Sequence, residues 1–345
     1  MQLLLQVALA AVFCSEQIIR YTEKQPQVGY RMRAMLAALL MVSISLSGCI
    51  NTGDSDSEAF EVDSVEKPGW QVGDWWLYTF ETAQFDEDTA RLVVTEIDDG
   101  EGLYMLGISS EREAQRHAVI NHNPFLGRVT IDALSVYENG DAQPVFNFPW
   151  TQGDTWGFTL LGENWMAETT GSINGKVIVE ATSSSGHSME YHFDGTHGFI
   201  DYFVWMDQDD ELQFRMSLTS TGSNYGGDVW FIRATDLKDR IFEGPIDGEV
   251  TDTFVDSGHP SGIDFNYYVF YLDVSIPMGG SGTISVKDHA GNSVLTRTYS
   301  PGTQSQELAT IPSRTDEYTL EVTLTGGQSA IHFMIAGGIE NYWEL

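Results

Sequence analysis

Cysteine is nearly absent from this chain of 345 residues, occurring only as Cys14 and Cys49. Both cysteines precede the segment in which strand patterns begin, so that segment has neither a disulfide nor a thiolate metal site. The chain also has no G-x-S-x-G elbow, no H-E-x-x-H pair and no glycine-rich phosphate loop. The sequence therefore offers no nucleophile in a recognisable catalytic setting.

Basic residues are scarce as well, with 17 Lys and Arg against 50 Asp and Glu. Residues 1–48 hold two acidic and four basic residues, so 48 acidic and 13 basic residues remain beyond them, a net charge of −35. Such a surface repels phosphate groups, and we expect no nucleic-acid partner. The acidic surface suits a salty medium, which screens the repulsion between its carboxylates. Solubility is the simplest explanation of the charge.

Apolar residues at helical spacing are also scarce, and residues 108–119 are the only modest helix candidate. Short apolar segments alternate with turn residues from Phe60 onward, as in all-β proteins. We predict a curved antiparallel sheet or half-barrel over residues 59–244. A small antiparallel β-sandwich is predicted over residues 245–345, beginning at the Gly244-Pro245 break.

One pattern, W-x-x-G-D-x-W, occurs twice, at residues 70–76 and 150–156. Each copy leads into an apolar, aromatic-rich segment. Glycine tolerates positive φ, and the Asp side chain can bond nearby backbone amides, so each copy predicts a turn that starts a strand. The flanking tryptophans are predicted to fix the turn on a core.

An export signal is indicated by residues 32–48, in which a basic start precedes an apolar run and then small residues. The run is too short for a membrane span, which needs about 20 residues. Its end, Leu46-Ser47-Gly48-Cys49, resembles the lipobox of secreted lipoproteins, in which the cysteine is lipidated. The resemblance implies a lipid anchor on Cys49 and a place on the extracytoplasmic face of the cell membrane. An ordinary signal peptide is the alternative.

The segments around this signal are predicted to lie outside the fold. Residues 49–58 are small and acidic, which is typical of a solvated linker between anchor and domain. Residues 1–31 do not fit in front of a signal, because they contain their own apolar run and a polar stretch. We expect them to be a non-native upstream extension, with translation starting at Met32.

The first predicted domain resembles secreted lipoproteins whose curved sheet is related to lipoprotein-carrier half-barrels. The resemblance lies in Phe148-Pro149-Trp150 and the following Gly-Asp turn, a strand with Val177 and Val179, and the run from Gly195 to Ile200. It implies a scaffold with an apolar ligand in the concavity. The candidate ligand-binding residues are Trp75, Trp76, Tyr78, Tyr202 and Trp205.

The second predicted domain resembles the small β-sandwich appended to secreted proteases and surface proteins of archaea and bacteria. Residues 268–274, 282–291 and 316–335 carry the resemblance. Such modules are accessory and imply no protease activity. Residues 265–276 are apolar on both faces, so we expect this strand to be covered by the first domain.

Two polar clusters are candidate metal sites. Glu190, His192 and Asp194 would share one strand face, with His187 or His197 nearby, although a solvated face explains them more simply. The turn containing Asp207, Asp209, Asp210 and Glu211 could bind Ca²⁺, although a solvated hairpin tip is again simpler. No other cofactor is expected.

The function predicted from the sequence is non-catalytic binding at the cell surface. An apolar ligand and a surface protein are the candidate partners, besides the membrane reached through the anchor. A surface adhesion or protein-interaction module is the first alternative. The second is a secreted hydrolase that uses a carboxylate and histidine site which no motif reveals.

Overall fold

The computed structural model describes residues 62–345 except 86, 121–122, 256–263 and 313–316. The upstream extension, the signal, Cys49 and the linker lie outside the described residues. A short 3-10 helix, η2 (Val62–Ser64), is the first element. Residues 59–345 form one compact unit.

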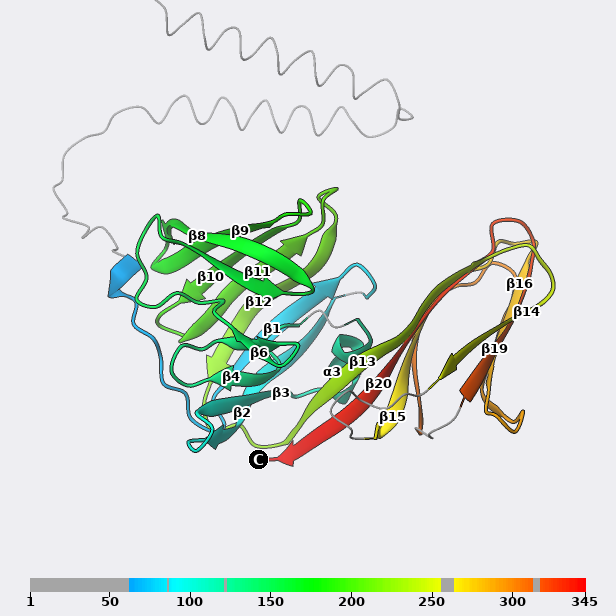
Figure 1. Cartoon of the computed structure of the whole chain (residues 1–345), viewed down its shortest axis with the longest axis horizontal. Coiled ribbons are helices and arrows are strands. Elements are labelled where there is room, and N and C mark those ends of the chain that lie inside the picture. Colours follow the sequence, from blue (N-terminus) through cyan, green and yellow to red (C-terminus); the bar gives the residue numbers. More distant parts are fainter. Residues whose placement is uncertain (1–61, 86, 121–122, 256–263, 313–316) are drawn as a thin grey trace, which may run out of the picture. The chain divides into compact units, whose positions relative to one another are not determined.

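The regular secondary structure of the described residues is almost entirely antiparallel strand (Figure 1). The larger of the two sheets has 16 strands. Thirteen follow the order β18-β15-β20-β13-β3-β2-β1-β12-β11-β10-β9-β8-β7, while β4, β5 and β6 extend from β3, so the sheet does not close into a barrel. The strands from β1 to β9 are β1 (Trp75–Thr82), β2 (Asp88–Asp98), β3 (Leu103–Ile108), β4 (Gly127–Thr130), β5 (Val136–Glu138), β6 (Asp141–Gln143), β7 (Thr155–Leu160), β8 (Glu163–Ile173) and β9 (Lys176–Ser183). The others are β10 (Ser188–Asp194), β11 (Phe199–Met206), β12 (Leu212–Gly222), β13 (Asp228–Glu243), β15 (Tyr267–Ser275), β18 (Gln304–Pro312) and β20 (Ala330–Glu344).

A separate sheet of four strands has the order β14-β19-β16-β17. Its strands are β14 (Ile246–Val255), β16 (Ser281–Lys287), β17 (Ser293–Tyr299) and β19 (Glu317–Thr325). Leu320, Val322 and Leu324 are fully buried, as their alternation predicts. Tyr318 of β19 packs edge-on against Tyr268 of β15 at 5.3 Å between ring centroids, so the two sheets share one core.

The first W-x-x-G-D-x-W copy forms the predicted turn. Gly73 has a φ of +86°, and the Asp74 carboxylate accepts a hydrogen bond of 2.7 Å from the Gln71 amide. The Gly73 amide donates to the Val94 carbonyl at 2.8 Å, and the Val94 amide donates to the Asp74 carbonyl at 2.9 Å. The turn is thereby attached to β2 before β1 begins.

The second copy repeats this hydrogen bonding on another part of the sheet. Gly153 has a φ of +83° and donates to the Thr169 carbonyl at 2.8 Å, and the Thr169 amide donates to the Asp154 carbonyl at 3.0 Å. Trp150 is completely buried, and its ring lies 6.3 Å from that of Trp156. Both copies therefore start a strand and hold it against a core.

The face of β10 and β11 that carries Tyr191, Phe193 and Phe203 is covered by the chain between the helix α3 (Glu111–Ile120) and β7. Phe146 lies 5.4 Å from Phe193, and Phe125 lies 5.5 Å from Phe203, measured between ring centroids. These residues belong to one buried cluster. The protein's own side chains thus fill the curve of the sheet here, a cover that the sequence patterns do not reveal.

The two-faced strand predicted at residues 265–276 is β15, and it serves two cores. Val269 and Tyr271 pack with the residues of β1, β2 and β3, while Phe270 and Leu272 pack in the sandwich. The Tyr271 hydroxyl donates to the Gln84 carbonyl at 3.0 Å. The expectation that the first domain covers this strand is confirmed. The predicted boundary at residues 244–245 falls between β13 and β14, where the chain changes sheets.

Candidate functional site: a polar cleft beside helix α3

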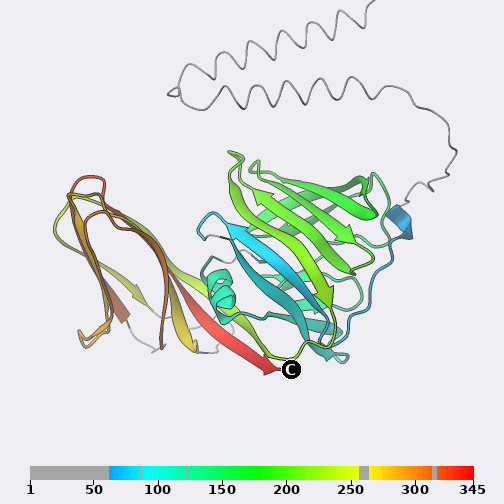
Figure 2. The same ribbon diagram turned by 180° about the vertical axis from the view of Figure 1, so that it is seen from behind.

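The α-helix of the described residues, α3 (Glu111–Ile120), lies close to residues 108–119, where the sequence offers a helix candidate. Ser110 caps its start, because its Oγ accepts a hydrogen bond from the Glu113 amide at 3.3 Å. The helix packs against β13, β15 and β20 (Figure 2). Its buried side includes Glu113 and Arg116 besides apolar residues, whereas Arg112 is exposed.

Arg116 is the centre of a buried ionic cluster. Its Nη1 lies 2.6 Å from Oε1 of Glu113 and 3.1 Å from Oδ2 of Asp88. Its guanidinium stands 4.6 Å from the centre of the Phe85 ring. The Glu113 and Arg116 side chains are only 3% and 8% exposed, so this charge is held in place by its partners rather than by water.

Burial raises the pKa of Glu113 to about 7. The positive charge of Arg116 acts in the opposite direction, and the negative charge of Asp88 raises the pKa further. His117 follows on the same helix, with its Nε2 3.8 Å from Oε2 of Glu113 and its ring packed edge-on against Phe80. Glu113 is therefore a carboxyl group that titrates near neutral pH.

This ionic cluster adjoins a cleft of about 1090 Å³, which lies between α3 and the start of β2 with the residues before it on one side and β15 and β18 on the other. The cleft is lined by Phe85, Glu87, Asp88, Arg112, Gln115, Arg116, Asp273, Val274, Ser275, Gln304, Ser305, Gln306 and Leu308. Its volume is on the scale of small-molecule sites, which occupy roughly 300–1000 Å³. Carboxylates, guanidinium groups, amides and hydroxyls predominate, so the cleft offers hydrogen-bond donors and acceptors together.

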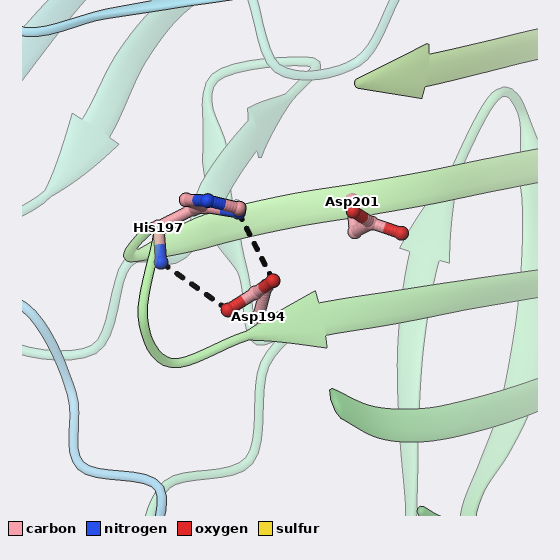
Figure 3. Close-up of side chains that lie close together, drawn as sticks. All are labelled: Asp194, His197 and Asp201. Atoms are coloured by element: carbon pink, nitrogen blue, oxygen red, sulfur yellow. Dashed lines mark hydrogen bonds and ion pairs between the residues drawn. The ribbon is translucent and has the colours of Figure 1, made fainter. Parts of the chain in front are cut away.

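A second group of polar side chains lies at the turn from β10 to β11 (Figure 3). One ligand atom from each of Asp194, His197 and Asp201 lies within 4.8 Å of the others. It is the one group of three potential metal ligands found among the residues that the structure describes. Oδ2 of Asp194 lies 3.0 Å from Nδ1 of His197, and Oδ2 of Asp201 lies 2.7 Å from Nζ of Lys176.

The metal-binding trio expected at residues 190–194 separates into two pairs. Oε1 of Glu190 lies 2.7 Å from Nε2 of His192, whereas the Asp194 carboxylate pairs with His197. The pairing of β10 with β11 shifts between His192 and Phe193, with Asp201 as the extra residue on β11, and Asp194 at the end of β10 is buried. Of the residues in that expectation, only Asp194 and His197 belong to the group of three potential ligands that includes Asp201.

The acidic turn is organised by one of its own carboxylates. Oδ1 of Asp207 accepts hydrogen bonds from the amides of Asp209 and Glu211, both at 2.9 Å, and Oδ2 accepts from the Gln213 side chain at 2.8 Å. These bonds lower the pKa of Asp207. Both of its oxygens are thus engaged within the hairpin, and Asp209, Asp210 and Glu211 are exposed.

The five aromatic candidates do not meet in one place. Trp76, Tyr78 and Trp205 are buried in the core, and the indole of Trp76 donates to the His197 carbonyl at 2.8 Å. Trp75 and Tyr202 are partly exposed, but Trp75 packs under Arg91 and Tyr202 against His192. None of the five lines the polar cleft.

Sequence reasoning misses the cleft because its residues come from segments far apart in the chain. The signal that was available is the pair of opposite charges at Glu113 and Arg116 inside the helix candidate, a spacing that places both on one side of a helix. The sequence does not show that this side is buried.

Among the described residues, no helix combines the length and apolar character needed to cross a membrane.

No family model and no curated protein matches this chain. Solved structures that resemble it include MucB (11% identity over 78% of this chain and 90% of MucB, TM-score 0.25). Others are the Pseudomonas aeruginosa MucA/MucB complex (10%, 81% and 91%, TM-score 0.22) and an exo-β-1,3-galactanase from Phanerochaete chrysosporium (8%, 75% and 68%, TM-score 0.20). TM-scores this low establish neither a common fold nor a common function.

Proposed function

We propose that this chain is a lipid-anchored protein of the extracytoplasmic membrane face with a non-catalytic binding role, and that the polar cleft beside α3 is its binding site. The observation that carries the proposal is Arg116 in the lining of the cleft, which is held by buried Glu113 at 2.6 Å and pairs with Asp88 of the same lining at 3.1 Å. Burying charged groups carries a desolvation penalty, and buried ionic clusters beside a cavity are typical of functional sites. The lipobox-like sequence ending at Cys49 supports the anchor.

The groups that line the cleft favour a neutral ligand rich in hydroxyl groups, such as a saccharide. Hydroxyl groups both donate and accept hydrogen bonds, so they can pair with the carboxylate of Asp273, the amides of Gln304 and Gln306, and the guanidinium of Arg112. A polyanion would meet three lining carboxylates on a chain with a net charge of −33. An apolar ligand would desolvate these groups without compensation.

A polar ligand also agrees with the packing of the curved sheet. The sequence predicts an apolar ligand in the concavity of the sheet, and the buried face of β10 and β11 is occupied by Phe125 and Phe146 of the same chain. The cleft beside α3 is open to a ligand without displacing any of this core. We therefore favour the cleft over the concavity as the binding site.

Binding can be tested by applying the purified full chain to an array of neutral, acidic and amino saccharides, with phospholipid vesicles tested in parallel. The proposal predicts saturable binding to neutral saccharides. Retention only on vesicles, or on no saccharide, would contradict it. Release of reducing ends from a bound saccharide would show a hydrolase instead of a binding protein.

The anchor requires a separate experiment, because it does not depend on the ligand. Cys49→Ser should release the protein from membranes into the medium or stall its processing. The matched control is Cys14→Ser, which should leave membrane retention unchanged. A Cys49→Ser protein that stays in the membrane fraction after normal processing would contradict a lipid anchor at this residue.

A further inference from the structure

The turn between β10 and β11 is fixed by the first tryptophan motif. The indole of Trp70 donates to the carbonyl of Gly198 at 3.0 Å, and that of Trp76 donates to the carbonyl of His197 at 2.8 Å. Oδ1 of Asp194 accepts from the amides of Thr196 and His197, at 2.8 and 3.2 Å. Both the backbone of the turn and the Asp194 carboxylate are therefore held before any ligand arrives.

Negative charge converges at this turn. Asp194 is only 5% exposed, and a second carboxylate, that of Asp201, approaches it from β11. Among the residues that the structure describes, the ammonium group that pairs with them is that of Lys176, on Asp201. Two carboxylates with a single positive partner leave a net negative charge, which the −33 charge of the whole chain reinforces. A cation would be stabilised here.

The donor set indicates which kind of cation. It contains one imidazole nitrogen and two carboxylates, whereas Ca²⁺ prefers six to eight oxygen ligands. Zinc accepts nitrogen and oxygen at about 2.1 Å, so donors on a single zinc ion lie at most about 4.2 Å apart. The ligand atoms here lie within 4.8 Å of one another, so the most widely separated donors would have to move closer together around the ion.

We propose that Asp194, His197 and Asp201 form a binding site for a divalent transition-metal ion of the zinc type, with Lys176 as the internal cation that the metal displaces from Asp201. Three protein ligands leave a fourth position for water. The His197 side chain is 40% exposed, so an ion can reach the site from solvent.

Zinc chloride titrated calorimetrically into the purified full chain tests the site. We expect one Zn²⁺ to bind per chain, and His197→Asn and Asp201→Asn each to weaken binding at least tenfold. The matched control is His332→Asn, because His332 pairs with Asp239 at 2.7 Å without belonging to a group of three ligands in the described residues. That variant should bind zinc as tightly as the parent chain.

Lys176→Gln tests the competition with the ammonium group, because its removal from Asp201 should tighten zinc binding relative to the parent. Equal zinc affinity in the parent, His197→Asn and Asp201→Asn chains would show an adventitious ion only and overturn the proposal. Circular dichroism identifies a variant that fails to fold, and the other ligand variant then decides. The outcome is independent of saccharide binding in the cleft.

Discussion

Arg116 donates from Nη1 to the carboxylate of Glu113 across 2.6 Å, within one turn of α3 and almost out of contact with water. The same nitrogen reaches Asp88 at 3.1 Å, which ties the start of β2 to the helix. Arg116 and Asp88 line the cleft, which therefore has a wall of fixed charges. Its geometry depends on both carboxylates keeping their common partner.

Removing that partner should destabilise the fold. Arg116→Met leaves Glu113 buried without its counter-charge, and we expect a loss of about 3 kcal/mol in the free energy of unfolding at pH 8, measured by urea denaturation. Arg112→Met is the matched control on the same helix. Because the Arg112 side chain is 66% exposed and 3.7 Å from Asp88, its loss should cost less than about 1 kcal/mol. Equal effects would contradict a buried cluster.

Stability should also depend on the titration of Glu113. The pKa of this carboxyl is about 7 in the folded chain and 4.5 as the ordinary value, so the folded state binds the proton more tightly than the unfolded state. Stability is therefore highest when Glu113 is protonated and falls as pH rises from about 4.5 to about 7. The decline should reach about 3 kcal/mol.

Comparison with Glu113→Gln isolates this contribution, because the variant keeps every other titrating group. The difference in unfolding free energy between parent and variant should change between pH 5 and pH 8 and then level off. A difference that stays constant over this range would show that Glu113 does not titrate there.

The two tryptophan motifs provide a matched pair of glycines. Both have positive φ, which an alanine adopts at a cost of about 1 kcal/mol. At Gly153 an added Cβ meets nothing within 4 Å, whereas at Gly73 it would lie 3.2 Å from the Tyr225 backbone nitrogen. Gly73→Ala should therefore destabilise the protein more than Gly153→Ala, by about 1 kcal/mol or more in thermal unfolding. The reverse order would contradict the described packing of the first turn.

Local patterns are sufficient to predict several of the strands of this protein. Alternation in residues 318–324 identifies the buried side of β19, and the apolar residues 265–276 identify a strand with two covered faces. Both W-x-x-G-D-x-W copies become equivalent turns, because glycine and aspartate determine turn geometry within a few residues. These features depend on neighbours in the sequence.

The candidate sites depend instead on long-range pairing. Asp88 and Arg116 meet across 28 residues, and the wall with Asp273 and Gln304 comes from strands much further along the chain. No period in the sequence encodes such contacts. At Asp194, the turn that follows β10 brings His197 to the carboxylate, and the irregular pairing of β10 with β11 leaves Asp201 as an extra residue on β11.

Calcium should have little effect on the acidic turn at residues 207–211. Asp207 already accepts three hydrogen bonds within the hairpin, so a Ca²⁺ ion would have to compete with them. We expect calcium to raise the melting temperature no more than magnesium at equal ionic strength, and Asp209→Asn to leave that response unchanged. A rise of many degrees at micromolar calcium, lost in Asp209→Asn, would show a specific site.

Filling the cleft is the most direct test of the central claim that it binds a neutral saccharide. Gln306 is exposed on β18 and lines the cleft, so Gln306→Trp should obstruct the ligand. Met166→Trp is the matched control, because Met166 is 59% exposed on β8 and does not line the cleft. Calorimetric titration with the saccharide that binds best on the array should give at least a tenfold weaker affinity for Gln306→Trp and an unchanged one for Met166→Trp. Equal affinity of the parent and Gln306→Trp, with both folded, would contradict the cleft as the binding site.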